Sequence, residues 1–232
     1  DGPRYKALGN SMAVPVMRVA GDRGEARPSF SQQEIEHLLA FMPAWVAREK
    51  LGRTQRFYAM KMLCWHYVEF LLYTGIRAGT ESKGIRWRNL QWHYADGRRY
   101  LRVWVSGKTG PRYLIARDAL ITSLERLMAW QGYEYANLAD MIAAGVDRRI
   151  FVMPAGDQPY ELSGVFGRLL ADAGLLLDSA GKTRTLYSLR HTYATFALAD
   201  GVPIHTLARQ MGTSVGMIER HYSKLTPMLD LS

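Results

Sequence analysis

A change of periodicity between residues 89 and 116 constrains the fold of this chain more than any other feature. Three short runs in this region are rich in aromatic and β-branched residues, which is typical of strands. Asp96-Gly97 separates the first two runs and Gly107-Lys108-Thr109-Gly110 separates the last two, and such sequences join antiparallel strands. We therefore predict a small three-stranded antiparallel sheet over residues 90–94, 100–105 and 112–115.

The chain on both sides of this region has apolar residues at helical spacing, so the predicted fold class is mainly α with this one small sheet. Ser31-Gln32-Gln33-Glu34 has the pattern of a capping box and predicts the start of a first helix. A second helix is predicted over residues 54–73 and ends at Gly75, a residue that favours a helix C-terminus. Further helices are predicted over residues 118–128, 163–173, 188–200, 203–211 and 214–222, with Ser163, Ser188 and Ser214 as N-caps, Pro203 as a first helical residue, and Gly201 and Gly212 as C-terminal stops.

The composition indicates one folded domain with a basic surface. The chain has 232 residues and 48% of them are hydrophobic, which is enough for a full core. Residues 1–30 carry scattered glycine, proline and arginine and are predicted to form a linker or an extended strap, which leaves residues 31–232 as the folded domain. The net charge of +9 favours a polyanionic partner such as nucleic acid, although a charge of this size also serves solubility alone.

Cysteine usage and hydropathy exclude several other classes. The single cysteine, Cys64, excludes a disulfide within one chain and a cysteine-based zinc site. It also favours a reducing compartment, which we take to be the cytoplasm. No stretch of about 18 uncharged apolar residues occurs, so we predict no membrane span.

Four short segments carry residues suited to chemistry on an anion. Arg77 lies in a turn after the second predicted helix, and Lys108 lies at the tip of the second predicted hairpin. Arg190 is predicted in the first turn of a helix, where free N–H groups also favour an anion. Tyr222 lies late in a basic helix. Taken singly, each has an ordinary explanation as a solvated charge or a packed tyrosine.

In this order and spacing, the segments resemble the tyrosine recombinase (phage integrase) family. The pieces that carry the resemblance are LLYTGIRAGTE, YSLRHTYAT and MGTSVGMIERHYSKL, and the match covers residues 31 to 225. The resemblance implies the catalytic domain of that family, which a separate N-terminal DNA-binding domain usually precedes. Glu81 matches the acidic residue that supports the first arginine, although it stands one residue further on than in many members. The catalytic residues that the resemblance implies are Arg77, Arg190, Lys108 and Tyr222.

The cleavage reaction that the resemblance implies requires these residue types. A phosphodiester attacked by a phenol oxygen gathers negative charge on its non-bridging oxygens, and arginine forks bind such oxygens in bidentate fashion. A hairpin lysine can give the leaving 5′-oxygen its proton, and a tyrosine nucleophile stores the bond energy as a 3′-phosphotyrosine. We expect no metal and no other cofactor, because the arginines supply the electrostatic stabilisation.

Two positions depart from the family pattern. Tyr187 stands where the family usually has histidine, and Thr213 stands where it usually has histidine or tryptophan. Both keep a hydroxyl that can bond a phosphate oxygen, but neither is a good base near neutral pH. We hypothesise that they orient the phosphate and that the proton of the nucleophile leaves through water or a neighbouring group. His191 fits the family's ordinary arginine-histidine-threonine sequence as a supporting residue, and His221 is a weaker candidate base.

The expected partner is a double-stranded DNA attachment site. The resemblance also implies a homotetramer in the synapse, allows a monomer in isolation, and suggests a phage or mobile-element origin in the bacterial cytoplasm or nucleoid. The side chains that we predict as neighbours of the DNA backbone are Lys182, Arg184, Arg209, Arg220, Arg86 and Arg112, with Lys83 and Arg88 as further candidates.

Two other functions remain open at this point. The first is a DNA-binding relative that has lost catalysis, because both usual histidines are missing. A pure binder, however, has no need of all four catalytic residue types. The second is an unrelated basic helical module that binds RNA, but the sequence lacks an aromatic strand motif for RNA.

Overall fold

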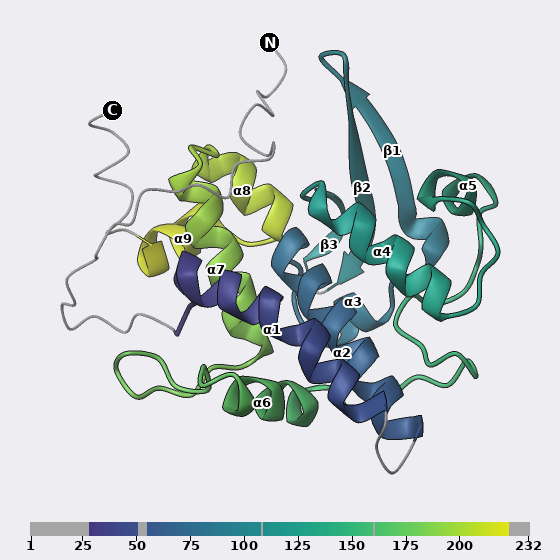
Figure 1. Cartoon of the computed structure of the whole chain (residues 1–232). Helices are drawn as coiled ribbons and strands as arrows, with labels where there is room; N and C mark the ends of the chain where they lie inside the picture. The colour runs from purple at the N-terminus through teal and green to yellow at the C-terminus, as the bar shows by residue number, and fades with distance from the viewer. Residues whose placement is uncertain (1–27, 51–54, 108, 160, 223–232) are drawn as a thin grey trace.

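The structure is a computed structural model, and it describes residues 28–50, 55–107, 109–159 and 161–222. Helices surround one small sheet (Figure 1). The elements are α1 (Gln32–Lys50), α2 (Gln55–Thr74), α3 (Thr80–Lys83), the 3-10 helix η2 (Trp87–Asn89), β1 (Leu90–Ala95), β2 (Arg98–Gly107), β3 (Gly110–Ile115), α4 (Ala119–Trp130), α5 (Leu138–Ala143), α6 (Ser163–Asp172), α7 (Leu186–Ala199), α8 (Ile204–Met211) and α9 (Val215–Tyr222).

The sheet is antiparallel with the order β1-β2-β3, as the sequence predicts. Val103 is opposite Leu90 on one side and Leu114 on the other, and all three are buried. The β1–β2 hairpin projects beyond the helices (Figure 1). Its turn is Asp96-Gly97, where both residues have positive φ (49° and 70°), which is the backbone that an Asp-Gly hairpin turn requires.

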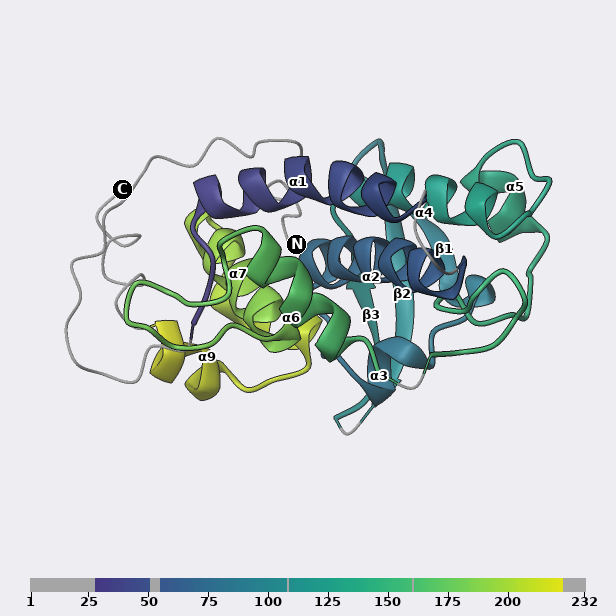
Figure 2. The same cartoon turned by 60° about the horizontal axis from the view of Figure 1, so that its bottom comes forward.

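Helix α2 lies at the centre of the main hydrophobic core. Its second half is buried from Leu63 to Thr74 apart from Trp65, and helices α1, α4, α6 and α7 all pack on it. Figure 2 shows α1 running beside α2. Burial on several sides explains why this stretch of sequence has so few charged residues. Among the described residues, no helix has the length and apolar character that a bilayer crossing needs.

A second, smaller core holds the C-terminal helices together. Tyr193 of α7, Leu207 of α8 and Ile218 of α9 pack here with Tyr100 and Ile115 of the sheet. The turn after α2, the β2–β3 hairpin and the end of α8 meet beside this second core, so the candidate site is built where the two cores adjoin.

Several predicted boundaries are confirmed. The amide N–H of Ser31 donates to the Glu34 carboxylate at 2.8 Å and the amide of Glu34 donates to Ser31 Oγ at 3.2 Å, which is the predicted capping box. Ser214 Oγ accepts from the amide of Met217 and caps α9, as predicted.

Other predicted boundaries are wrong. Thr185, not Ser188, is the N-cap of α7, and Ser188 returns the second bond of a capping box. Arg190 therefore lies in the second turn of α7 and not in the first. Helix α6 begins at Ser163 with Leu162 as its N-cap. The short helix α5 was not predicted, because its six residues are too few to reveal a period.

The start of the folded domain also differs from the prediction. Phe30 was assigned to the linker, but its ring is buried and its amide donates to Thr192 Oγ1 at 2.9 Å. The folded part thus includes Phe30, and the predicted linker over residues 1–27 lies outside the described residues.

Candidate active site

Arg77 lies in a tight turn that follows α2. Gly75 begins this turn with φ +64°, a left-handed backbone that side chains with a Cβ rarely adopt. A Cβ on Gly75 would also lie 2.2 Å from Cδ1 of Tyr193 in α7. Only glycine therefore lets the turn pack this closely on α7. This packing fixes the main-chain position from which the side chain of Arg77 extends.

Arg190 reaches this turn from α7. Its guanidinium is buried and donates to the carbonyl oxygen of Gly75 at 2.5 Å and to that of Met211 at 2.7 Å. Arg190 thus connects the turn before Arg77 with the end of α8.

The C-terminal end of α8 is the common acceptor of three arginines. The carbonyl of Gly212 accepts from Arg77 Nη2, that of Met211 accepts from Arg190 and Arg112, and that of Gln210 accepts from Arg112 Nε at 3.0 Å. The partial negative charge at a helix C-terminus favours such cations. These carbonyls belong to the set that a helix end leaves without intrahelical partners.

Gly212 makes this arrangement possible. Its φ of +62° ends α8 in the left-handed conformation, and the amide of Thr213 bonds back to the carbonyl of Ala208 at 3.0 Å. A Cβ on Gly212 would lie 2.6 Å from Cζ of Arg112 and 2.7 Å from Oγ1 of Thr109. The absent side chain leaves room for both.

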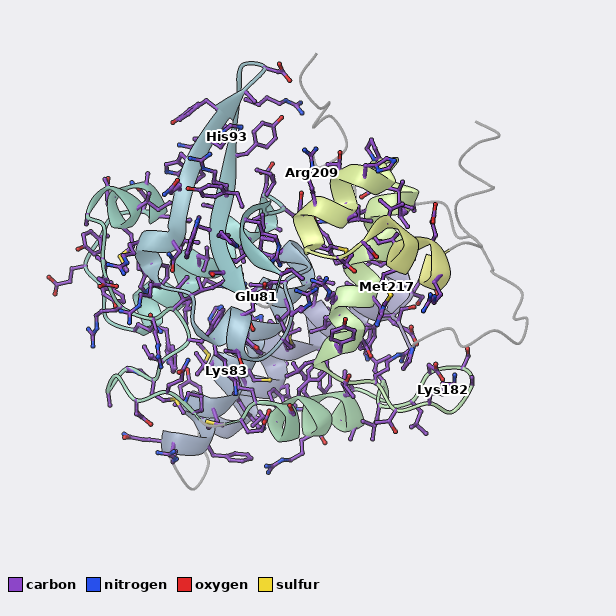
Figure 3. The ribbon with its side chains drawn as sticks, turned by 180° about the vertical axis from the view of Figure 1, so that it is seen from behind. Glu81, Lys83, His93, Lys182, Arg209 and Met217 are labelled. Carbon is purple, nitrogen blue, oxygen red and sulfur yellow. The ribbon has the colours of Figure 1, made fainter. Side chains whose placement is uncertain are left out.

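Glu81 is the carboxylate of the cluster, and Figure 3 shows it between the sheet and the C-terminal helices. Its side chain accepts from the amide of Arg77 at 3.2 Å and from Nη1 of Arg112 at 2.6 Å, and it lies 3.9 Å from Nη1 of Arg77. Burial by itself would raise the pKa of Glu81. The bonds and charges of Arg112 and Arg77 outweigh burial and hold that pKa below its ordinary value.

The β2–β3 hairpin closes one side of the cluster. Thr109 Oγ1 accepts from Nη1 of Arg77 at 3.3 Å. A Cβ on Gly107 would lie 2.6 Å from Oε1 of Glu81, so a larger residue there would push the hairpin away. The predicted lysine between them, Lys108, lies outside the described residues.

The site is strongly electropositive. Three guanidinium groups gather at the end of α8 and one carboxylate lies among them, so the cluster carries a net positive charge that an anion can neutralise. Burial, and then the charge of Arg77, lowers the pKa of Arg190 to about 10, while Tyr187 and Glu81 act in the opposite direction. Arg190 is therefore still charged at neutral pH.

Solved structures share this fold. The chain superposes on XerA recombinase with a TM-score of 0.60, 18% identity and coverage of 91% of this chain and 66% of that one. It superposes on XerH site-specific recombinase bound to difH substrate with a TM-score of 0.59, 16% identity and coverage of 90% and 55%. For a lambda integrase dimer bound to a COC′ core site the values are 0.55, 17%, 84% and 61%. The fold is that of a tyrosine recombinase catalytic domain.

The chain spans about half to two thirds of the length of these recombinases. No family model matches its sequence. A stretch of 23 residues, 10% of the chain, is 83% identical to part of a DNA N-6-adenine-methyltransferase of Escherichia phage P1 and covers 3% of that protein. So short a match carries no argument about activity.

On this recombinase fold, the two departures from the family pattern flank the arginines. Tyr187 lies in the first turn of α7, is partly exposed, and its ring meets that of His191 edge to face at 4.9 Å. Tyr187 lies three residues before Arg190 on α7, so the two side chains share one face of that helix. Thr213 follows Gly212 directly and is half-buried. His191 is buried beneath Tyr187, which fits a supporting role.

The predicted nucleophile, Tyr222, ends α9. The side chains of Tyr222 and His221 lie outside those that the structure describes, so their predicted roles remain predictions. Ile218, one turn earlier, anchors α9 in the second core.

Two of the predicted DNA-backbone residues are wrong, because the recombinase fold turns them inward. Arg184 is buried and donates to both oxygens of Glu34 at 2.8 Å and to the main-chain carbonyls of Ser29, Leu175 and Leu177. The guanidinium of Arg112 donates to the carboxylate of Glu81 and to the two main-chain carbonyls at the end of α8. To contact a phosphate at the surface, each guanidinium would have to break an ion pair with a carboxylate, which Arg77 Nη2 and Arg190 do not have to do. Sequence alone could not reveal this, because each partner is distant in the chain.

The other predicted DNA-backbone residues lie at the surface. Lys182, Arg209 and Arg220 are exposed, and Figure 3 shows Lys182 at the periphery and Arg209 on α8. Arg86 pairs with Asp147 at 2.8 Å, and Arg88 pairs with the same carboxylate at 2.9 Å. The charge of this pair of arginines is therefore partly neutralised.

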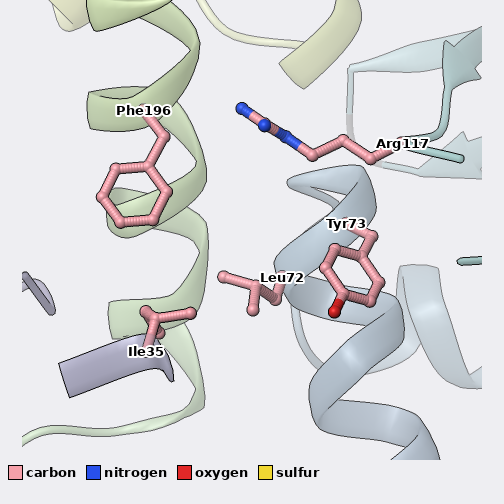
Figure 4. Close-up of a pocket in the computed structure, with 5 residues that line it drawn as sticks. All are labelled: Ile35, Leu72, Tyr73, Arg117 and Phe196. Atoms are coloured by element: carbon pink, nitrogen blue, oxygen red, sulfur yellow. The ribbon is translucent and has the colours of Figure 1, made fainter. Parts of the chain in front are cut away.

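In the described part of the chain, no metal centre competes with the arginine cluster. This part contains no group of three or more histidine, cysteine or acidic side chains that could hold a metal. A small, largely apolar pocket lies between α1, α2 and α7 (Figure 4), and the guanidinium of Arg117, one of its lining residues, pairs with Asp200 at 2.8 Å. Its lining residues are Ile35, Leu72, Tyr73, Arg117 and Phe196.

Proposed function

We propose that the chain is the catalytic domain of a site-specific DNA recombinase or integrase that cuts and rejoins strands through a 3′-phosphotyrosine. The observation that carries the proposal is the meeting of Arg77 and Arg190, from two separate elements, on the same turn of α8 beside Glu81. Two charged forks held in fixed positions suit a phosphodiester whose non-bridging oxygens gain charge during reaction.

In the proposed reaction, Arg77 and Arg190 bind the two non-bridging oxygens of the scissile phosphate. The Oη of Tyr222 forms a bond to phosphorus, and the bond between phosphorus and the 5′-oxygen breaks. Lys108 gives its proton to the departing 5′-oxygen, which leaves as a hydroxyl. Attack by a 5′-hydroxyl on the phosphotyrosine reverses these steps, so rejoining needs no external energy source.

Tyr187 and Thr213 have the proposed role of orienting the phosphate. The place of Tyr187 on the same face of α7 as Arg190, and of Thr213 directly after Gly212, supports this role. Because neither hydroxyl is a good base near neutral pH, the proton of Tyr222 leaves through water or a neighbouring group. If Tyr187→Phe and Thr213→Val both left the cleavage rate unchanged, the orienting role would be wrong.

The proposed partner is a double-stranded DNA attachment site. XerH and lambda integrase were solved with their DNA sites, and the net charge of +9 suits a DNA ligand. Lys182, Arg209 and Arg220 are the exposed cations that we propose as backbone contacts. A homotetramer in the synapse and an origin in a phage or mobile element, with action in the bacterial cytoplasm, extend the same proposal.

The test is a covalent trapping assay. The protein is incubated with nicked duplex DNA of its element's attachment site, so that the short leaving strand diffuses away and the adduct accumulates. We expect a protein–DNA adduct on a denaturing gel that disappears with Tyr222→Phe, a variant that removes only the nucleophilic oxygen. An equal amount of adduct from Tyr222→Phe would show that Tyr222 is not the nucleophile.

A DNA-binding relative without catalysis is the second candidate function. The observation that favours it is the presence of Tyr187 and Thr213 where histidines are usual in the family. DNA binding without any adduct, both for this chain and for the protein with a DNA-binding domain attached, would support this candidate over the enzyme.

A further inference from the structure

Arg112 joins two elements of the site with one side chain. It lies on β3, just after the hairpin turn, and its guanidinium points to the site. Nη1 donates to Glu81 on α3 at 2.6 Å, while Nε and Nη2 donate to the carbonyls of Gln210 and Met211 at the end of α8 at 3.0 and 3.3 Å. The planar fork of arginine can satisfy acceptors in several directions at once, which the point charge of lysine cannot.

The acceptors of Arg112 are shared with the two arginines proposed to bind phosphate. Glu81 also accepts from the amide of Arg77, and the carbonyl of Met211 also accepts from Arg190. Arg112 therefore contacts one hydrogen-bond partner of Arg77, the carboxylate of Glu81, and one partner of Arg190, the carbonyl of Met211. Any shift of its guanidinium would move the groups that fix both.

The charges show what Arg112 does for Arg77. Glu81 is a buried carboxylate with two cations near it, Arg112 at 2.6 Å and Nη1 of Arg77 at 3.9 Å. A buried carboxylate that loses its ion-pair partner draws the next cation toward it, because an unpaired buried charge is costly. Without Arg112, the guanidinium of Arg77 would close on Glu81 and be unavailable to an anion.

We propose that Arg112 is a positioning residue for the cleavage reaction: by neutralising Glu81 and holding the end of α8, it keeps Arg77 free to bind the scissile phosphate. This inference rests on the proposed function. It differs from a direct DNA contact, which the sequence suggested for Arg112, because the residue acts through Glu81 and Arg77 and touches no substrate.

The chain offers a matched control. Arg117 follows the same strand, is similarly buried, and pairs with Asp200 at 2.8 Å, but none of its described bonds reaches the arginine cluster. Arg117→Ala and Arg112→Ala each remove a part-buried arginine from one carboxylate. A general loss of stability would therefore affect both variants alike.

The decisive protein is the double variant that carries both Arg112→Ala and Glu81→Gln. Single-turnover cleavage of the nicked duplex and DNA affinity are measured separately for each variant. We expect Arg112→Ala to slow cleavage on the order of 100-fold, because a misplaced group near the reaction costs about that much, while the dissociation constant for DNA changes little. Since the glutamine amide would carry no charge to capture Arg77, the double variant should recover much of the rate. Arg112→Lys should lie between wild type and Arg112→Ala.

A second readout needs no cleavage. The guanidinium ¹⁵N–¹H signals of Arg77 are recorded in the protein without DNA, and we expect Arg112→Ala to shift them and the double variant to restore them. Unchanged Arg77 signals in Arg112→Ala, or no recovery in the double variant, would overturn the inference. If the proposed function itself were wrong, the outcome would be different. The wild-type protein would then form no Tyr222-dependent adduct.

Discussion

Arg190 donates a 2.5 Å hydrogen bond to the carbonyl oxygen of Gly75 across 115 residues of sequence. This bond connects helix α7 to the turn that carries Arg77, so a shift of either element would strain or break it. Tyr193, one turn further along α7, packs on Gly75 at the same place. The spacing of the two guanidinium groups is thus set by main-chain contacts before any ligand binds, which is the condition for electrostatic preorganisation.

Replacing Gly75 by alanine should disrupt this spacing. The positive φ costs roughly 1–2 kcal/mol for a residue with a Cβ, and the overlap with Tyr193 adds about 1–3 kcal/mol. We expect a loss in the free energy of unfolding that urea denaturation can measure. Cleavage should be lost as well.

Gly132→Ala is the control for this prediction. Gly132 also has positive φ (+80°), but no described atom lies within 4 Å of the place where its Cβ would stand. Gly132→Ala should lower the free energy of unfolding only by the cost of the backbone strain, and it should leave cleavage unchanged. Equal losses in the two variants would show that the contact with Tyr193 contributes nothing.

Local sequence patterns were enough to predict much of the fold and part of the site. The turns at Asp96-Gly97 and after β2 indicated the sheet, and the sequence around Arg77 and Arg190 indicated the two arginines that the structure brings together. The inward orientation of Arg112 could not be predicted, because its acceptors are set by the end of α8, 98 and 99 residues later in the chain. A positive charge looks the same in a sequence whether it faces DNA or a buried carboxylate.

Arg184 and Arg209 should therefore respond differently to substitution. Arg184→Ala leaves Glu34 without its partner and removes bonds to three carbonyls, so we expect a loss on the order of 3 kcal/mol in the free energy of unfolding. Arg209→Ala removes an exposed charge and should leave stability within about 0.5 kcal/mol.

DNA binding separates the same two variants. If Arg209 contacts a phosphate, its loss should reduce the slope of log affinity against log salt by about one. Folded Arg184→Ala should keep the wild-type slope. A reduced slope for Arg184→Ala would mean that its guanidinium reaches DNA after all.

Cys64 should be inert in the folded protein. The thiol is buried in the main core, and burial raises its pKa to about 12, so almost no thiolate exists at neutral pH. We expect no reaction with a thiol-specific reagent in native buffer and one equivalent in denaturant. Fast labelling of the native protein would contradict the packing of α2.

His66 should make stability fall in mild acid. It lies in a buried network between α2 and α4, where Nδ1 meets Ser123 Oγ at 3.3 Å and Glu69 is held by Arg126 at 2.8 Å. Burial is the main cause that lowers the pKa of His66, and the charge of Arg126 adds to it, while Glu69 opposes them. The folded state therefore resists a proton that the unfolded chain takes up near pH 6.5.

The sign and size of this effect follow from linkage. The stability that neutral His66 contributes is complete above pH 6.5, and it is lost as pH falls because the unfolded state then binds more protons. Between pH 8 and pH 5 the loss is at most about 2 kcal/mol for one proton. His66→Gln should be less stable at pH 8 yet flatter over this range, whereas His205→Gln, at an exposed position of α8, should keep the wild-type slope. An unchanged slope in His66→Gln would mean that another group carries the pH dependence, since the pKa of Glu69 is lowered and its own contribution is lost only at more acidic pH.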